Sequence, residues 1–250
     1  MLGNNDNHRN PVSESYHSQI ILLIFGLLLI RLVSLFLSPY NLHGDEAQYW
    51  AWSKDLDWGY FTKPPGIAAV IGATTSIFGD AEWAVRLGSP LLHSATGYVI
   101  YRTGRYLFSG ATGFWAAALY ILMPAVWMSS AIISTDVPLL FCYAVALNGW
   151  AHLRSTPSLL RAGQTGLAIG LGVLCKYAML FFLPALILIA LIDRPTRKAL
   201  LSIYGGIILL LLIACVTPNL CGMRKMTLPH SAIRRRIPIF SKACPSTPWS

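Results

Sequence analysis

Long apolar stretches separated by short polar segments run through most of this chain. The first, residues 19–38, has the roughly 20 residues that a membrane-spanning helix needs. It is too long for the core of a signal peptide and lacks a small-residue cleavage site, so we expect a retained span. Further stretches lie at residues 84–101, 110–130, 137–153, 164–176, 178–192 and 199–216. The pattern predicts an all-α integral membrane protein with about seven spans, of which 164–176 and 178–192 are short enough to be kinked or broken.

The cations of the short loops predict how these spans are oriented. With the N-terminus in the cytoplasm, successive cytoplasmic loops carry Arg102 and Arg105, then Arg154 and Arg161, then Arg194, Arg197 and Lys198. We therefore expect residues 1–18 to be a cytoplasmic tail and residues 19–216 a polytopic region. Residues 40–83 become the first extracytoplasmic loop, which is rich in acids and in interface-seeking aromatic residues.

The composition excludes a water-soluble globule and a disordered chain. Hydrophobic residues make up 55% of the sequence and charged residues only 12%, about half the usual share in soluble domains. The net charge of +9 is mainly a property of residues 221–250, which hold six basic residues and no acid. This uneven distribution gives no basic face on a folded module, so we expect no nucleic-acid partner.

Residues 217–250 do not fit the predicted topology. The last span should exit on the extracytoplasmic side, yet this tail would place its cations there, against the usual charge bias. Loss of one G from TGGTGG would convert Asn-Leu-Trp-Trp-Asn into the Asn-Leu-Cys-Gly-Met of residues 219–223. We hypothesise that the chain is out of frame from about Leu220 and truncated, which sequencing of the gene would test.

Short motifs on the predicted extracytoplasmic side carry the residues best suited to chemistry. They are residues 43–50 (His-Gly-Asp-Glu-Ala-Gln-Tyr-Trp), 62–66 (Thr-Lys-Pro-Pro-Gly), 134–138 (Ser-Thr-Asp-Val-Pro) and 175–177 (Cys-Lys-Tyr). A carboxylate at the mouth of a membrane cavity can act as a general base. A fixed cation can neutralise a phosphate that gains charge as it leaves. Ionisable groups at the bilayer edge are costly, and their convergence on one side favours a functional site.

Each of these residues also has a purely structural interpretation. Asp45 can cap an interfacial helix, and Asp136 suits the start of a span because of the helix dipole. Lys63 can extend to lipid headgroups, and Arg86 can meet either a lipid phosphate or a substrate phosphate. No His has a partner at metal-ligand spacing, so we expect no metal site from the residues alone.

The order of these motifs resembles glycosyltransferase family 39, over about residues 20–220. The likeness rests on Gly44 to Tyr49, Thr62 to Pro65, Arg86-Leu87, Thr135 to Pro138 and Cys175 to Tyr177. This family includes protein O-mannosyltransferases, the aminoarabinose transferase of lipid A and galacturonosyltransferases of lipopolysaccharide cores. The resemblance implies the N-terminal part of a GT-C type fold in the inner membrane. It implies transfer of a sugar from a polyprenyl-phosphate donor to a lipid, glycan or protein acceptor, usually with inversion.

The resemblance also implies roles for individual residues. Asp45, with Glu46 beside it, corresponds to a catalytic base or acceptor-orienting acid, and Asp136 to a second acid that supports the centre. Donor-phosphate contacts are implied for Lys63, Arg86 and Lys176. Aminoarabinose transferases carry a metal-linked acid just before the Lys, whereas this chain has Thr62. A divalent metal cofactor is therefore not assigned.

Two other interpretations remain open. Several spans with scattered ionisable residues also suit a transporter subunit, but transporters place their polar residues near the bilayer midplane rather than in an outer loop. A frame change near Leu220 would instead make the chain an inactive remnant of a transferase.

Overall fold

The computed structural model of the chain describes residues 11–60 and 63–226. All regular secondary structure in these residues is helical, which confirms the predicted fold class. Residues 1–10, 61–62 and 227–250 lie outside the described residues. Most of the expected cytoplasmic tail, most of the expected out-of-frame segment and the residue at position 62 are among them.

The helices follow the apolar stretches closely, with two additional helices inside the predicted first loop and a short third helix across its end. In chain order they are α1 (Pro11–Phe36), α2 (Gly44–Ser53), α3 (Gly66–Phe78), α4 (Glu82–Arg86), α5 (Gly88–Leu107), α6 (Gly110–Leu122), α7 (Pro124–Ser130), α8 (Asp136–Ser155), α9 (Leu159–Cys175), the 3-10 helix η1 (Tyr177–Phe181), α10 (Phe182–Ile192), α11 (Arg194–Leu200) and α12 (Ile203–Met226).

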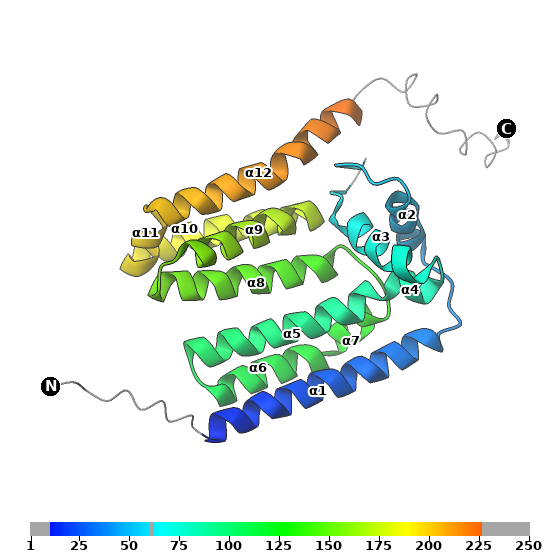
Figure 1. Ribbon diagram of the computed structural model, residues 1–250, viewed down its shortest axis with the longest axis horizontal. Helices are drawn as coiled ribbons and strands as arrows, with labels where there is room; N and C mark the ends of the chain where they lie inside the picture. Colours follow the sequence, from blue (N-terminus) through cyan, green and yellow to red (C-terminus); the bar gives the residue numbers. More distant parts are fainter. Residues whose placement is uncertain (1–10, 61–62, 227–250) are drawn as a thin grey trace, which may run out of the picture.

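The long helices form a bundle with two closely packed groups (Figure 1). In one group α1 packs on α5 and α6, around Ile20, Tyr101 and Ala117. In the other, α9 packs between α8 and α12. The contact of α5 with α8 joins the two groups. Helices α2, α3 and α4 gather at one end of the bundle, so the predicted first loop is a compact helical cap rather than an extended segment (Figure 1).

Fewer helices meet the criteria for a membrane span than the sequence pattern predicts. Among the described residues, Ser15–Phe36 of α1 and Ile203–Leu220 of α12 are long and apolar enough to cross a membrane. A third span is added if α6 and α7, bent by 58° at their junction, count as one. The expectation of about seven spans is therefore not confirmed. Helices α5 and α8 are 20 residues long but carry polar residues that are buried in the bundle, such as His93, Thr96 and Asn148.

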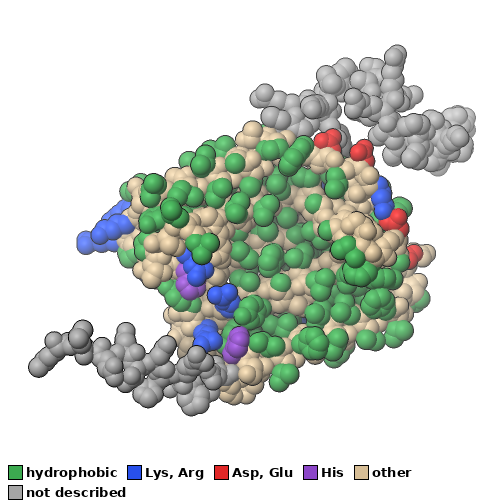
Figure 2. All heavy atoms as spheres, in the orientation of Figure 1, with side chains coloured by type: hydrophobic (Ala, Val, Ile, Leu, Met, Phe, Trp, Pro, Cys, Tyr) green, Lys and Arg blue, Asp and Glu red, His purple; other side chains and the backbone are tan. Residues whose placement is uncertain are grey.

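Charge is segregated between the two ends of the bundle. Hydrophobic side chains cover the visible face between them, as expected of a surface that meets lipid (Figure 2). In this view acidic side chains lie at the end where α2 to α4 gather, whereas Arg and Lys lie mainly at the opposite end (Figure 2). We call these the acidic end and the basic end.

Candidate functional site

The first turn of α2 holds two adjacent acids with different surroundings. Asp45 and Glu46 open the helix, where carboxylates suit the positive end of the helix dipole. Glu46 reaches back to accept a hydrogen bond from the backbone N–H of His43 at 3.0 Å. Asp45 is exposed whereas Glu46 is only 2% exposed. Of the two, Asp45 is the carboxylate that a substrate can reach.

Glu46 and Arg86 form a buried ion pair with several further hydrogen bonds. Arg86 Nε and Nη2 donate to the two oxygens of Glu46 at 2.9 and 2.7 Å. The same guanidinium donates to the carbonyls of Tyr40 and Asn41, and the backbone N–H of Ile133 donates to Glu46 at 2.9 Å. This network ties α2 to the chain before it, to α4 and to the segment that leads into α8.

These contacts set the charge state of Glu46. Burial alone raises the pKa of Glu46 because it disfavours a carboxylate. The hydrogen bonds from Arg86, His43 and Ile133 and the positive charge of Arg86 outweigh burial, so the pKa lies below its ordinary value. Glu46 therefore stays ionised at neutral pH and holds α2 in place. Arg86 is only 2% exposed, and its guanidinium already donates to Glu46 and to backbone carbonyls.

Asp45 and Asp136 both act on Tyr49, although they are far apart in the sequence. Tyr49 lies in α2 and is buried. Burial raises the pKa of Tyr49, and the negative charges of Asp45 and Asp136 raise it further. Both predicted acids therefore lie at the acidic end of the bundle, near enough for their charges to act on Tyr49.

Asp136 and Lys176 form an ion pair between two helix ends. Asp136 begins α8, and Lys176 occupies the extended residue between α9 and η1. Lys176 Nζ lies 2.6 Å from Asp136 Oδ1. Both side chains are accessible, with 36% of Lys176 and 54% of Asp136 exposed. A cation placed in this way can contact a phosphate from solvent or from the lipid boundary while it remains oriented by the acid.

The loop that carries Lys63 folds back toward these groups. The Tyr60 N–H donates to the Lys63 carbonyl at 3.1 Å, and the Tyr60 ring stacks on Trp52 with centroids 4.6 Å apart. Just after Lys63, Gly66 meets the last turn of α9 so closely that a Cβ would lie 2.7 Å from Cys175 Sγ. Helix α3, which begins three residues after Lys63, therefore packs against Cys175, the residue that precedes Lys176.

Asn219 is a buried polar residue at the acidic end that the sequence analysis did not identify. Asn219 of α12 is fully buried, donates to the Trp58 carbonyl at 2.6 Å and accepts from the Tyr177 hydroxyl at 3.1 Å. It joins the first loop to the residue after Lys176. An Asn within an apolar stretch is the signal that could have marked it, because polar groups inside a membrane helix need partners.

The described residues assemble no metal centre. No group of three or more His, Cys, Asp or Glu side chains is placed among them to hold an ion. Asp45, Asp136 and Lys176 instead offer carboxylates and a cation suited to acid–base and phosphate chemistry.

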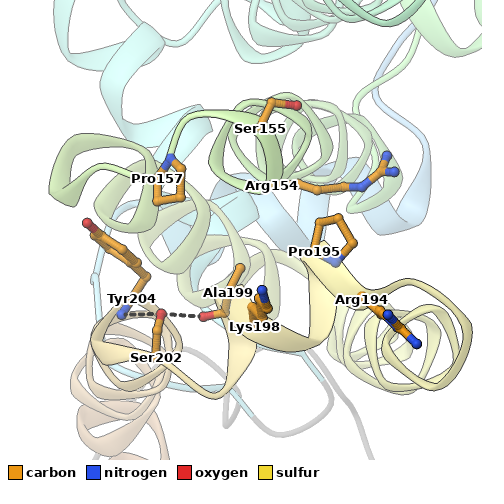
Figure 3. A pocket seen from close by; sticks show the side chains of 9 residues that line it. All are labelled: Arg154, Ser155, Pro157, Arg194, Pro195, Lys198, Ala199, Ser202 and Tyr204. Atoms are coloured by element: carbon orange, nitrogen blue, oxygen red, sulfur yellow. Dashed lines mark hydrogen bonds between the residues drawn. The ribbon is translucent and has the colours of Figure 1, made fainter.

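Two cavities among the described residues lie at the other end of the bundle. One of about 410 Å³ is lined by Arg154, Arg194, Lys198 and Tyr204 among others (Figure 3). It lies at the basic end, far from α2 along the bundle, and its lining contains none of the predicted site residues. The acidic end is therefore assigned by its convergent side chains rather than by an enclosed pocket.

Comparison with known proteins agrees with these motifs. Residues 62–221 match the family described as dolichyl-phosphate-mannose-protein mannosyltransferase. The chain belongs to this family. The matched segment contains Lys63, Arg86, Asp136 and Lys176, and so most of the groups at the acidic end of this family member.

Two curated relatives align with most of this family member. The lipid A galacturonosyltransferase RgtD of Rhizobium johnstonii is 38% identical over 201 residues, which cover 80% of this chain and 42% of the relative. The undecaprenyl phosphate-alpha-4-amino-4-deoxy-L-arabinose arabinosyl transferase 1 of Pseudomonas fluorescens is 28% identical over 213 residues, covering 77% and 39%. This chain thus spans about two-fifths of the length of these relatives. No solved structure matches it significantly.

Proposed function

We propose that this chain is part of a membrane glycosyltransferase that moves a sugar from a polyprenyl-phosphate donor to a lipid acceptor. The family match and the two relatives, which are named as glycosyltransferases and one as acting on lipid A, support the reaction class. The observation that carries the proposal is the accessible Asp136–Lys176 ion pair at the acidic end, where Asp45 also lies exposed in the first turn of α2. A protein or glycan acceptor remains an alternative of the same chemistry.

In the proposed reaction the acceptor hydroxyl attacks the anomeric carbon of the sugar. Its proton passes to the carboxylate of Asp45, which acts as general base. The bond between the anomeric carbon and the phosphate oxygen breaks, and the lipid phosphate leaves with the electron pair. Lys176 and Lys63 neutralise the charge that develops on this phosphate, while Asp136 orients Lys176. Attack opposite the leaving group inverts the anomeric carbon.

Glu46 and Arg86 take a different role in this proposal. Their groups are buried and occupied by one another and by backbone atoms, so direct contact with the donor would require the network to open. We assign both to positioning: they hold the first turn of α2, and with it Asp45, beside the start of α8.

The proposed orientation places the acidic end outside the cytoplasm. The concentration of Arg and Lys at the other end agrees with the charge bias of membrane proteins (Figure 2). The N-terminus then lies in the cytoplasm, and the protein resides in the inner membrane, where a lipid-linked donor is available.

Transfer of radiolabelled sugar from a polyprenyl phosphate, measured with membranes that contain the chain, tests the proposal. Asp45→Asn should lower transfer by roughly 10²- to 10⁴-fold, the usual contribution of a general base. Asp55→Asn, which alters another exposed carboxylate of the same loop, is the matched control and should retain transfer. Equal rates for wild type and Asp45→Asn would remove Asp45 from this role.

Donor binding provides a second measurement. Lys176→Gln should weaken cross-linking to a photoreactive polyprenyl phosphate, and stability should change little because exposed ion pairs contribute about 0–1 kcal/mol. Unchanged cross-linking would contradict the phosphate contact.

An inactive remnant is the second candidate. The family match ends at residue 221, beside the position where we hypothesise the frame change. This candidate predicts donor cross-linking without transfer. An intact reading frame through codons 219–250 would exclude the frame change.

A further inference from the structure

A second cavity, of about 400 Å³, opens at the basic end between α1, α5 and α8. Its lining includes His17 from α1, Tyr101, Arg102 and Arg105 from α5, and His152 from α8. Figure 2 shows Arg or Lys and His side chains together in a hollow at this end of the molecule. The cavity is separate from Asp45, Asp136 and Lys176, which lie at the acidic end.

The described residues of the lining are positively charged and include no carboxylate. Arg105 lies three residues after Arg102 and four after Tyr101, so it neighbours each of them on α5. No carboxylate among the described residues lies within ion-pairing distance of Arg102. At the neighbouring cavity, by contrast, Arg154 is engaged by Asp193 through bonds of 2.9 and 3.0 Å.

Two polar groups of the lining have unused hydrogen-bonding capacity. Among the described residues the Tyr101 hydroxyl has no hydrogen-bond partner, and Tyr101 as a whole is fully buried. His17 stacks on Tyr101 with ring centroids 5.8 Å apart, and its Nδ1 is likewise buried with no partner in the part of the chain that the structure describes. Buried polar groups are normally hydrogen-bonded, so orphaned groups beside a basic cavity indicate a ligand with acceptor oxygens.

We propose that this cavity binds a phosphate ester, with the headgroup of an anionic phospholipid as its source. The Arg102 guanidinium matches the oxygens of a phosphate, the Tyr101 hydroxyl can donate to it, and Arg105 adds positive charge to the lining. Leu107 and Phe108, which end α5 next to the arginines, are 41% and 74% exposed and offer an apolar surface for acyl chains. A soluble phosphate ester shares the headgroup chemistry but makes no use of that surface. The proposal does not depend on the sugar-transfer reaction.

The test compares wild-type and variant chains in phosphatidylcholine vesicles with increasing phosphatidylglycerol, followed by native mass spectrometry of the lipid retained in detergent. Arg102→Gln should lower retained phosphatidylglycerol roughly tenfold, as expected for one lost charge-assisted hydrogen bond. Tyr101→Phe, which removes only the unpartnered hydroxyl, should lower it less. Arg197→Gln removes a charge at the same end but outside the cavity lining and should retain the lipid.

A parallel arm distinguishes the two sources. Thermal stabilisation by glycerol 3-phosphate, lost in Arg102→Gln, supports the site with a soluble ligand, whereas retention of phosphatidylglycerol alone supports the lipid. If Arg102→Gln fails to fold, the amount of phosphatidylglycerol that Tyr101→Phe retains decides whether the cavity binds the lipid. Equal retention by wild type and both cavity variants without stabilisation by glycerol 3-phosphate would overturn the proposal, as would an equal loss in Arg197→Gln.

Discussion

Asp45 and Glu46 at the start of α2 differ in burial because adjacent side chains point in different directions around a helix. Asp45 faces outward, whereas Glu46 turns toward Arg86 and the backbone before α8. The difference follows from which face of α2 packs on the bundle. In chemical type the two acids are alike, so only their burial distinguishes Asp45, which we propose as the base, from the buried anchor Glu46.

Glu46→Gln should destabilise the protein strongly. The variant leaves the Arg86 guanidinium buried without its counter-charge, which costs about 3–5 kcal/mol. Thermal unfolding in detergent provides the measurement. Asp45→Asn is the control and should change stability by less than about 0.5 kcal/mol because the residue is exposed. Similar melting curves for the two variants would contradict the buried-anchor role.

The stabilising contribution of Glu46 should depend on pH in one direction. Its folded-state pKa is depressed, so the contribution is fully present above the ordinary Glu pKa of about 4.3. It is lost as pH falls through the depressed value, because protonation breaks the ion pair. The difference in unfolding free energy between wild type and Glu46→Gln should therefore shrink only under acidic conditions. If the difference instead grows as pH falls, the pKa of Glu46 is not lowered on folding.

Asn219→Leu should loosen the first loop. The change leaves the Trp58 carbonyl and the Tyr177 hydroxyl without the Asn219 partner, at a cost of about 1–3 kcal/mol. Limited proteolysis should cut faster between α2 and α3 than in wild type. Thr217→Leu, an exposed substitution on the same helix, is the control and should not alter this cleavage.

At the scale of elements, the packing of α3 on α9 brings the Lys63 motif to Lys176. Helix α3 begins at Gly66 against Cys175, and the Pro residues before it stop the chain from continuing as one helix. The aromatic stack of Trp52 and Tyr60 closes the same loop from the other side. Neither contact is periodic in the sequence, so the return of the loop was not predictable from the hydrophobic pattern.

Gly66→Ala should push α3 away from α9. Its Cβ would lie 2.7 Å from both Cys175 Sγ and the Leu174 carbonyl, a crowding that costs about 1–3 kcal/mol. Gly163→Ala meets nothing within 4 Å and should instead stabilise its helix by about 0.5–1 kcal/mol. Opposite shifts in melting temperature are expected. A Gly66→Ala protein as stable as wild type would show that this contact yields easily.

The whole molecule presents an acidic end with the candidate site and a basic end with two cavities (Figure 2). A membrane accommodates this arrangement when the basic end faces the cytoplasm. We propose separate ligand chemistry for the two ends: sugar transfer at the acidic end, and binding of a phosphate ester at the basic end.

Cysteine labelling tests this orientation. In a background without the native cysteines, Gln48→Cys in α2 should react with a membrane-impermeant maleimide on intact spheroplasts. Thr156→Cys, after α8, should react only once the membrane is permeabilised; both positions are exposed in the fold. Reaction of both positions from the same side would refute the separation of the two ends.

The all-α class, the approximate position of each long helix and the motifs at one end can be recognised from the amino-acid sequence alone. Apolar length and cation placement are local properties of the chain, so they can be recognised without a fold. The number of spans was less predictable, because α5 and α8 use polar residues for packing inside the bundle. The pairing of Glu46 with Arg86, the pairing of Asp136 with Lys176 and the bond from Asn219 to the loop were revealed by the folded arrangement of the helices. Such contacts depend on how each helix is rotated against its neighbours, which no local pattern specifies.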